Sequence, residues 1–244
     1  MKYQSPEGEI AALSNVSLDI MEGEFISIVG PSGCGKSTLL NIIAGLTDPS
    51  AGKILLNNKL VHGPTGMVGY MPQRDQLFEW RTIWENVILG LEIQNKINEK
   101  TLSFAAKLLK DYGLYEFKDK YPSQLSGGMR QRVSLIRTLA INPDILLLDE
   151  AFSALDYQTR LVVSDEVKQI IIKENKTALL VTHDLSEAIS MADKVVVLTK
   201  RPGTIKSIHL IKLTCDLQTP LGCREAPEFR EYFNRIWKEL DVHV

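Results

Sequence analysis

The sequence predicts an α/β fold built around a mostly parallel β-sheet. Along the 244 residues, short apolar runs rich in β-branched side chains alternate with longer segments of helical periodicity. One apolar run leads directly into a glycine-rich loop that opens a helix, and another ends in two adjacent carboxylates. Both arrangements are typical of parallel strands whose carboxyl ends meet at one edge of a sheet, where α/β proteins bind their ligands.

Each predicted strand is a short apolar run, and each predicted helix is a longer segment with apolar residues three or four positions apart. The predicted strands are 25–29, 53–56, 67–70, 145–148, 178–181, 195–198 and 204–213. The predicted helices are 36–44, 82–91, 100–112, 128–140, 158–173 and 185–191.

The region from about 76 to 141 has helical periodicity and no convincing strand. We therefore predict a helical subdomain at about 76–141, inserted into a core at about 1–75 and 142–215. A helical tail is expected at about 226–244, because an apolar stripe lies on one face of a helix over 227–240. We interpret this stripe as a packing face; its members are Phe229, Phe233, Ile236 and Leu240.

The composition is that of a globular protein with a sizeable core: 44% of the residues are hydrophobic, 24% are charged, and the net charge is −2. A nucleic-acid binder more often carries a basic excess, so we predict no nucleic-acid partner. No apolar run approaches the roughly 20 residues that span a bilayer. If the protein serves transport across a membrane, we expect a separate protein to supply the pore.

The chain has three cysteines, Cys34, Cys215 and Cys223, and none of them forms a CxxC pair. Such a sparse, odd number suits a reducing compartment better than a disulfide framework. We therefore expect free thiols, with a bond between Cys215 and Cys223 as the alternative.

The segment after the predicted strand 25–29 fits the phosphate-binding pattern G-x-x-x-x-G-K-[ST]. Glycines let the backbone curl round phosphate groups, and the following helix adds its positive N-terminal end. The alternative is a glycine-rich turn with a chance lysine, which the strand–loop–helix context disfavours. Lys36 is expected to reach the β- and γ-phosphates and Ser37 to bind Mg²⁺. The predicted loop consists of Gly30, Pro31, Ser32, Gly33, Cys34, Gly35, Lys36, Ser37 and Thr38.

Two acids follow the predicted strand 145–148, at the edge of the sheet where the phosphate loop also lies. Asp149 is placed to hold the Mg²⁺ shell, and Glu150 is placed to polarise the attacking water as a general base. Alone, such a pattern describes an acidic turn equally well. Together with the phosphate loop it predicts hydrolysis of a nucleoside triphosphate.

With these motifs in place, the chain resembles the ABC ATPases over nearly its whole length. The most specific motif is the sequence Leu-Ser-Gly-Gly-Met-Arg-Gln-Arg at 125–132, which is similar to the signature loop of that family. Gln73 matches the Q-loop, the segment 153–156 matches the D-loop, and His183 matches the switch histidine. Tyr3 matches the aromatic residue that stacks on adenine, although the chain starts about ten residues later than most members of the family.

The resemblance implies a P-loop NTPase of the ABC ATPase fold, with N-terminal antiparallel strands beside the parallel core. It also implies a homodimer in which two copies pack head to tail around ATP and Mg²⁺. Gln73 and His183 would join Lys36 and Glu150 in catalysis, and Gln73 would also sense the metal. The partner copy would complete each ATP site with Ser126, Gly127 and Gly128.

The segment 76–87 is similar to the ATPases of bacterial importers for nitrate, sulfonates, taurine and thiamine precursors. This resemblance implies membrane permease subunits as partners, an extracytoplasmic solute-binding protein as an indirect partner, and a location on the cytoplasmic face of the membrane. Trp80 and Phe78, beside Arg81, are expected to anchor the permease, unless they belong to the core of the helical subdomain. An exporter subunit, a soluble ABC ATPase, a non-hydrolysing scaffold and an ordinary P-loop kinase are the alternatives.

Overall fold

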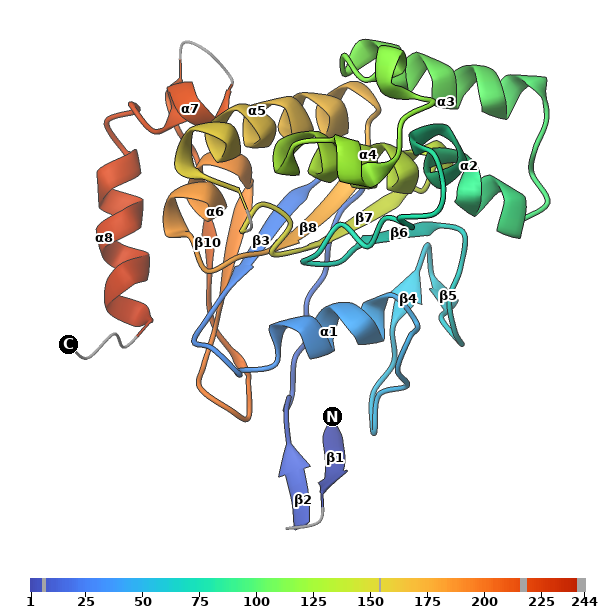
Figure 1. Ribbon diagram of the computed structural model, residues 1–244. Helices are drawn as coiled ribbons and strands as arrows, with labels where there is room; N and C mark the ends of the chain where they lie inside the picture. The colour runs from blue at the N-terminus through green and yellow to red at the C-terminus, as the bar shows by residue number, and fades with distance from the viewer. Residues whose placement is uncertain (6–7, 154, 216–218, 241–244) are drawn as a thin grey trace.

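The computed structural model describes residues 1–5, 8–153, 155–215 and 219–240 (Figure 1). The strands are β1 (Lys2–Ser5), β2 (Gly8–Ala11), β3 (Phe25–Val29), β4 (Leu55–Leu56), β5 (Lys59–Leu60), β6 (Val68–Met71), β7 (Ile145–Asp149), β8 (Thr177–Val181), β9 (Lys194–Leu198) and β10 (Ile205–Leu210). The helices are α1 (Lys36–Ile43), α2 (Ile83–Ile93), α3 (Glu99–Asp111), η1 (Tyr115–Phe117), η2 (Pro122–Gln124), α4 (Gly127–Ala140), α5 (Tyr157–Lys173), α6 (Leu185–Met191), α7 (Pro220–Cys223) and α8 (Phe229–Glu239).

The central sheet has the strand order β10-β9-β3-β8-β7-β6. Only β10 runs antiparallel to its neighbour, so the prediction of a mostly parallel sheet is confirmed. The register aligns Ile28 with Val181 and Asp149 with Val181 on either side of β8. The strands β3, β6, β7 and β8 therefore end at one edge, and the loops that follow them meet there.

The alternation of side chains along the strands divides the core between the two faces of the sheet. Ile26 and Ile28 of β3 pack toward α1, with Leu147 of β7 in the same cluster. The neighbouring Leu146 and Leu148 pack on the other face, with α4, α5 and α6. Figure 1 shows α1 beneath the sheet and these three helices above it. Buried on both faces, the strands read as continuous apolar runs.

The region between β6 and β7 contains helices and no strand among its described residues. Thr82 begins α2 with a reciprocal capping box to Glu85, and Asn98 begins α3 in the same way with Thr101. Helix α2 packs on α4, and α3 packs on α4 beside it. The exact limits of a separate helical subdomain, a core and a tail stay a prediction.

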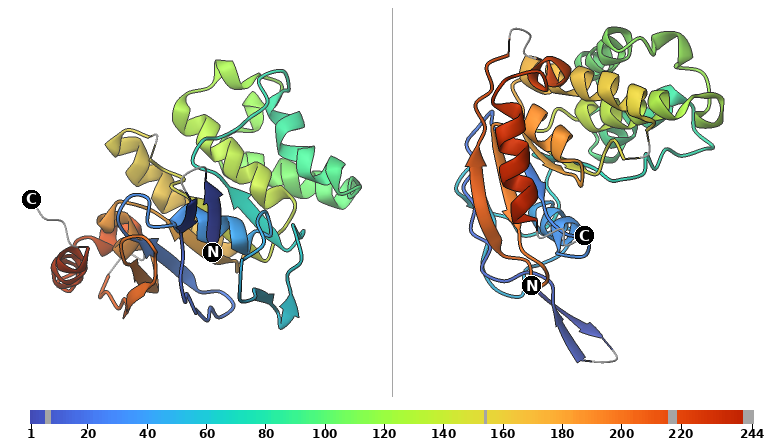
Figure 2. Two further views of the ribbon diagram at one scale, coloured as in Figure 1. Left: turned by 90° about the horizontal axis from the view of Figure 1, so that it is seen from below. Right: turned by 90° about the vertical axis from the view of Figure 1, so that its left-hand side faces the viewer.

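Two strand predictions differ from the structure. The predicted strand 53–56 is reduced to β4, which pairs with β5 in a small sheet of its own, because its neighbouring residues are exposed and no core strand accepts them. The predicted strand 204–213 ends at Leu210. Strands β1 and β2 pair antiparallel and project as a hairpin away from the body, with Tyr3 in β1 (Figures 1 and 2).

The expectation of free thiols at Cys215 and Cys223 was wrong. The structure joins them in a disulfide with their Cα atoms 5.0 Å apart. Helix α7, which the sequence did not predict, turns the chain back and brings Cys223 within reach of the segment after β10. Cys34 is a free, buried cysteine.

The predicted tail helix forms as α8 and lies along one side of the molecule (Figure 2). Its buried Ile236 joins the core, and Phe229, Phe233 and Leu240 pack against that core. Residues 241–244 of the predicted tail lie outside the described residues. Across the described part of the chain, no helix combines the length and the apolarity that a membrane span requires.

Candidate active site

The phosphate loop links β3 to α1 and holds Lys36 in a wound backbone. Gly33 and Gly35 have φ angles of 73° and 108°, which residues with a Cβ rarely adopt. The Lys36 ammonium donates to the carbonyl oxygens of Gly30 (2.7 Å) and Pro31 (3.0 Å), and only 8% of Lys36 is exposed. Gly35 occupies the N-cap of α1 without a side-chain cap, so the first N–H groups of this helix are left for an anion.

Cys34 is a buried residue of this loop, and its side chain leaves no room for a side chain at position 30. A Cβ placed on Gly30 would lie 2.9 Å from the Cys34 Sγ and 3.1 Å from the Leu198 Cβ. Close packing against Cys34 and Leu198 therefore favours glycine at position 30.

Asp149 lies at the end of β7 with a hydroxyl group on each carboxylate oxygen. Ser37 Oγ donates to Oδ1 and Tyr70 Oη donates to Oδ2, both at 3.2 Å. Burial raises the pKa of the Asp149 carboxyl, against the two hydrogen bonds that lower it. Burial and the nearby Asp149 likewise raise the pKa of Tyr70. Ser37 and Asp149 therefore lie together as predicted, and Tyr70 is an additional partner that the sequence analysis missed.

Glu150 stands beyond the strand in a left-handed backbone conformation, with φ of 47°. Such angles are uncommon for residues other than glycine, and they gather at functional sites. The Glu150 N–H donates to Val181 O (2.8 Å), and its carbonyl accepts from Ser153 Oγ (2.9 Å). These bonds hold the turn that aims the Glu150 side chain away from the core.

Two predicted side chains converge on the Glu150 carboxylate. Gln73 Nε2 donates to Oε2 at 2.9 Å, and His183 Nδ1 lies 3.5 Å from the same oxygen. Gln73 follows β6 and His183 follows β8, so the strands on either side of β7 deliver both residues. His183 has 61% of its side chain exposed, which leaves it accessible from solvent.

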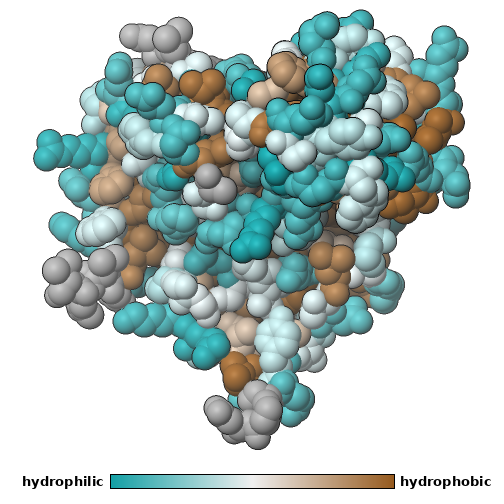
Figure 3. Space-filling model, in the orientation of Figure 1, coloured by the Kyte–Doolittle hydropathy of each residue, from teal (hydrophilic) through white to brown (hydrophobic). Residues whose placement is uncertain are grey.

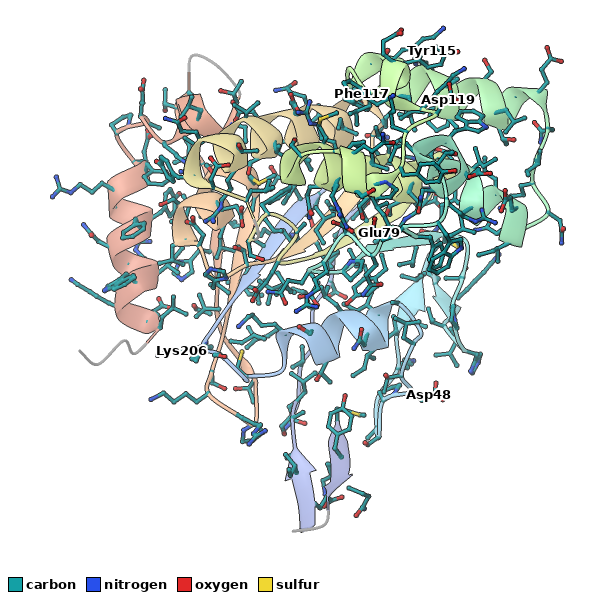
Figure 4. The ribbon with its side chains drawn as sticks, viewed as in Figure 1. Asp48, Glu79, Tyr115, Phe117, Asp119 and Lys206 are labelled. Atoms are coloured by element: carbon teal, nitrogen blue, oxygen red, sulfur yellow. A yellow bond between two sulfur atoms is a disulfide. The ribbon has the colours of Figure 1, made fainter. Side chains whose placement is uncertain are left out.

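Helix α4 fixes the segment that follows Gln73. Arg130 Nε bonds Asp75 Oδ2 (2.9 Å), and its Nη2 bonds Glu79 (2.8 Å), which lies just below α4 in Figure 4. Arg137 donates to the carbonyls of Asp75 (2.6 Å) and Gln76 (2.8 Å). These contacts were not predicted, because nothing in the sequence pattern of α4 indicates which of its arginines face residues 75–79.

Helix α4 also begins with the signature loop. Ser126 is its N-cap and accepts from the Met129 N–H at 3.4 Å, and Gly127 and Gly128 form its first turn. A Cβ on Gly127 would meet nothing within 4 Å, so this backbone is open to approach. Among the described hydrogen bonds and ion pairs, none joins these three residues to the phosphate loop of the same chain. Ala154 of the predicted D-loop lies outside the described residues.

Tyr3 lies beside the phosphate loop, although it comes from the N-terminal hairpin. Its hydroxyl donates to Thr38 Oγ1 at 3.5 Å, and 39% of the residue is exposed. The ring is therefore held near the start of α1 with part of its surface free, as a base-stacking residue requires.

Removing the Tyr70 hydroxyl by Tyr70→Phe is expected to destabilise the fold by about 1 kcal/mol, the usual net value of one such hydrogen bond. Asp149 would keep only Ser37 as a side-chain partner, so its carboxylate would be held less firmly. Urea unfolding monitored by circular dichroism measures the change. An unchanged free energy of unfolding would show that Tyr70 does not support Asp149.

Known proteins resemble this chain in sequence and in fold. The ABC transporter family profile matches residues 13–153, more than half of the chain. An uncharacterized ABC transporter ATP-binding protein, YtlC, of Bacillus subtilis is 46% identical over 98% of this chain and 92% of its own length. The nitrate import ATP-binding protein NrtD of Synechocystis sp. is 40% identical over 96% and 90%. The taurine import ATP-binding protein TauB of Ruegeria pomeroyi is 43% identical over 95% and 87%.

Among solved structures, a dimeric ATP-binding cassette in a post-hydrolysis state, bound to ADP and Pi, has a TM-score of 0.75 and 33% identity. The match covers 86% of this chain and 95% of that one. A phosphate loop and strand-end carboxylates on a parallel sheet define a P-loop nucleoside triphosphatase. Within that class, this chain belongs to the ABC transporter family, and it is an ATPase of the kind that includes nitrate and taurine import proteins.

Proposed function

We propose that this ATPase powers an importer of a small organic or anionic solute, from the cytoplasmic face of the membrane. The observation that carries the catalytic part is the convergence of Gln73 and His183 on the Glu150 carboxylate, beside the phosphate loop. The import direction is supported by the relatives NrtD and TauB, whose names specify nitrate and taurine import.

ATP binding is assigned to the phosphate loop and Tyr3. The N–H groups at the start of α1 receive the phosphates, and Lys36 exchanges its carbonyl partners on Gly30 and Pro31 for phosphate oxygens. Tyr3 stacks on the adenine ring. The exposed Ser32 and Gly33 leave the mouth of the loop open for the nucleotide.

The residues at the strand ends fit Mg²⁺. This ion prefers oxygen ligands and is usually held by one or two protein groups together with the phosphates. Ser37 Oγ, the Asp149 carboxylate and the Gln73 side chain supply such oxygens, and the first two already lie 3.2 Å apart. When bound, the ion offsets negative charge on the phosphate oxygens. It would also offset the cost of burying the charged Asp149 carboxylate, the burial that raises its pKa.

Hydrolysis is assigned to Glu150, with two supporting side chains. Glu150 accepts the proton of the attacking water, and Gln73 holds the carboxylate through its amide hydrogen bond. His183 contacts the γ-phosphate from the accessible side of the site. The left-handed turn at Glu150 fixes where the base stands before the substrate arrives.

A second copy of the chain completes the ATP site. At the N-terminus of α4, Ser126 and Gly127 are exposed, and Gly127 has free space where a side chain would stand. Gly128 is buried in the first turn beside Thr159, so only its backbone can take part in the site. A helix N-terminus with a hydroxyl cap and bare N–H groups suits the γ-phosphate of an ATP bound to the other copy. The dimeric cassette among the structural matches supports this arrangement.

The permease partner is assigned to the helical region. Trp80 is 73% exposed, so it is not a core residue, and its ring contacts that of Phe78 at a tilt of 32° with the centroids 4.8 Å apart. Arg81 beside it is paired with Glu92 at 2.7 Å. Figure 3 shows hydrophobic surface at the margin formed by the end of α2, where Ile93 is 72% exposed. Exposed aromatic and aliphatic side chains of this kind are typical anchors for a partner.

The variant Trp80→Ala is expected to uncouple the transporter: solute uptake falls at least about tenfold, as for loss of an interface anchor, while basal ATP hydrolysis is retained. Uptake and phosphate release are measured on the reconstituted complex. Trp237→Ala is the matched control, because Trp237 is also exposed (46%) but lies on α8. Equal loss of uptake and hydrolysis in the Trp80 variant would indicate misfolding and contradict the anchor role.

The importer assignment is tested by purifying the tagged chain from detergent-solubilised native membranes and identifying the accompanying proteins by mass spectrometry. A polytopic membrane protein together with an extracytoplasmic solute-binding protein is the expected result. Ligand screening on that binding protein would then identify the solute. A membrane protein without a binding protein would indicate an exporter, and soluble partners alone would contradict a transport role.

A further inference from the structure

His183 lies in the loop between β8 and α6, and hydrogen bonds fix the residues on either side of it. Asp184, the residue after His183, begins α6 by accepting hydrogen bonds from the N–H groups of Ser186 (2.8 Å) and Glu187 (3.2 Å). The Asp184 N–H in turn donates to Thr182 Oγ1 at 3.0 Å. The backbone on both sides of His183 is therefore fixed by local bonds, and one oxygen of the Asp184 carboxylate remains for another partner.

Arg160 supplies that partner from α5. Its Nη1 lies 3.6 Å from Asp184 Oδ2, and its Nη2 donates to the Leu155 carbonyl at 2.9 Å. Leu155 ends the loop that starts with Glu150, so a single guanidinium joins the loop of the general base to the loop of the histidine. Only 22% of the Arg160 side chain is exposed, and its Nε is buried without a hydrogen-bond partner in the described part of the chain.

The position of Arg160 in α5 is unfavourable in local terms. A cation in the first turn of a helix opposes the helix dipole, and burial of a charge is costly unless it is well paired. The buried Glu187 of α6 is a second carboxylate that interacts electrostatically with Arg160. Arg224, the C-cap of α7, is a second cation that acts on Glu187. The guanidinium of Arg160 thus links two loops from a position where an arginine does not stabilise the helix itself.

We infer that Arg160 is a positioning residue for hydrolysis, which holds His183 at its 3.5 Å separation from Glu150 by bridging Leu155 and Asp184. This inference rests on the proposed role of His183. Because reacting groups lose about a hundredfold in rate when displaced by about an ångström, Arg160→Ala lowers kcat by about tenfold to a hundredfold and leaves ATP affinity unchanged. Lysine keeps the charge near Asp184 but cannot bond both partners as a planar fork can, so Arg160→Lys recovers thermal stability without recovering kcat.

The test is a double-mutant cycle on the full-length chain, with kcat, ATP affinity and thermal unfolding measured for Arg160→Ala, His183→Ala and the double variant. If Arg160 acts through His183, its removal lowers kcat less than about twofold further in the His183→Ala background. Lys173→Ala is the control, since Lys173 also lies on α5 and pairs at the surface with Asp111 at 3.1 Å. Lys173→Ala is expected to leave kcat unchanged relative to each background.

Three results would overturn the inference, and they differ in what else they imply. Multiplicative losses in the double variant, or full recovery of kcat by Arg160→Lys, would show that Arg160 supports the fold without positioning His183. Wild-type kcat in His183→Ala alone would refute the role proposed for the histidine, and the role of Arg160 with it.

Discussion

Replacing Glu150 with glutamine is expected to slow ATP hydrolysis at least about a hundredfold, which is the typical contribution of a general base. ATP binding is expected to remain, because the phosphate loop does not depend on the Glu150 side chain. The substitution is nearly isosteric: the amide oxygen can still accept from Gln73, and the backbone bonds to Val181 and Ser153 do not involve the side chain. Single-turnover hydrolysis and equilibrium binding of ATP separate the two effects.

The matched control is Asp144→Asn, which makes the same acid-to-amide change at the opposite end of β7, where Asp144 is exposed. This control keeps wild-type turnover. If Glu150→Gln also hydrolysed ATP at nearly the wild-type rate, Glu150 would not be the base, and the convergence of Gln73 and His183 would need another explanation.

The variant Lys36→Ala is expected to lose ATP affinity by about tenfold to a hundredfold, since hydrogen bonds to a charged group contribute roughly 1.5–3 kcal/mol. The loss has two sources. The ammonium no longer reaches the phosphates, and the loop loses the bonds that Lys36 makes to Gly30 and Pro31. Isothermal titration calorimetry measures the affinity directly.

Lys53→Ala serves as the control, because Lys53 is an exposed lysine outside the phosphate loop, between α1 and β4. It binds ATP as the wild type does. Tight ATP binding by the Lys36 variant would contradict the phosphate-binding role of the loop, provided that its unfolding midpoint shows that it is folded.

The parts of the site that depend on short sequence spacing could be predicted from the sequence. The phosphate loop is continuous in the chain, and the apolar run before Asp149 and Glu150 identifies a buried strand with its acids at one end. Gln73 and His183 were predicted to join this site only through the resemblance to the ABC ATPases. Their meeting on one oxygen of Glu150 is a finding of the structure.

The contacts between distant segments could not be predicted in this way. Tyr70 reads as one residue of an apolar strand, and only the pairing of β6 with β7 brings its hydroxyl to Asp149. No partner was predicted for Arg130 or Arg160, yet each bridges segments that helix packing brings together. The prediction of free thiols at Cys215 and Cys223 was wrong for the same reason. Helix α7 is a short turn without periodicity, and only the tertiary structure brings Cys223 close to Cys215.

We propose that ATP joins two copies of this chain, with the phosphate loop of one facing Ser126 of the other. The most direct measurement is the mass of the Glu150→Gln variant by light scattering, with and without ATP and Mg²⁺. With ATP, we predict twice the chain mass of 27.4 kDa, and a return to the single-chain mass when Ser126→Arg is added. A variant that binds ATP but keeps the mass of one chain would contradict the claim.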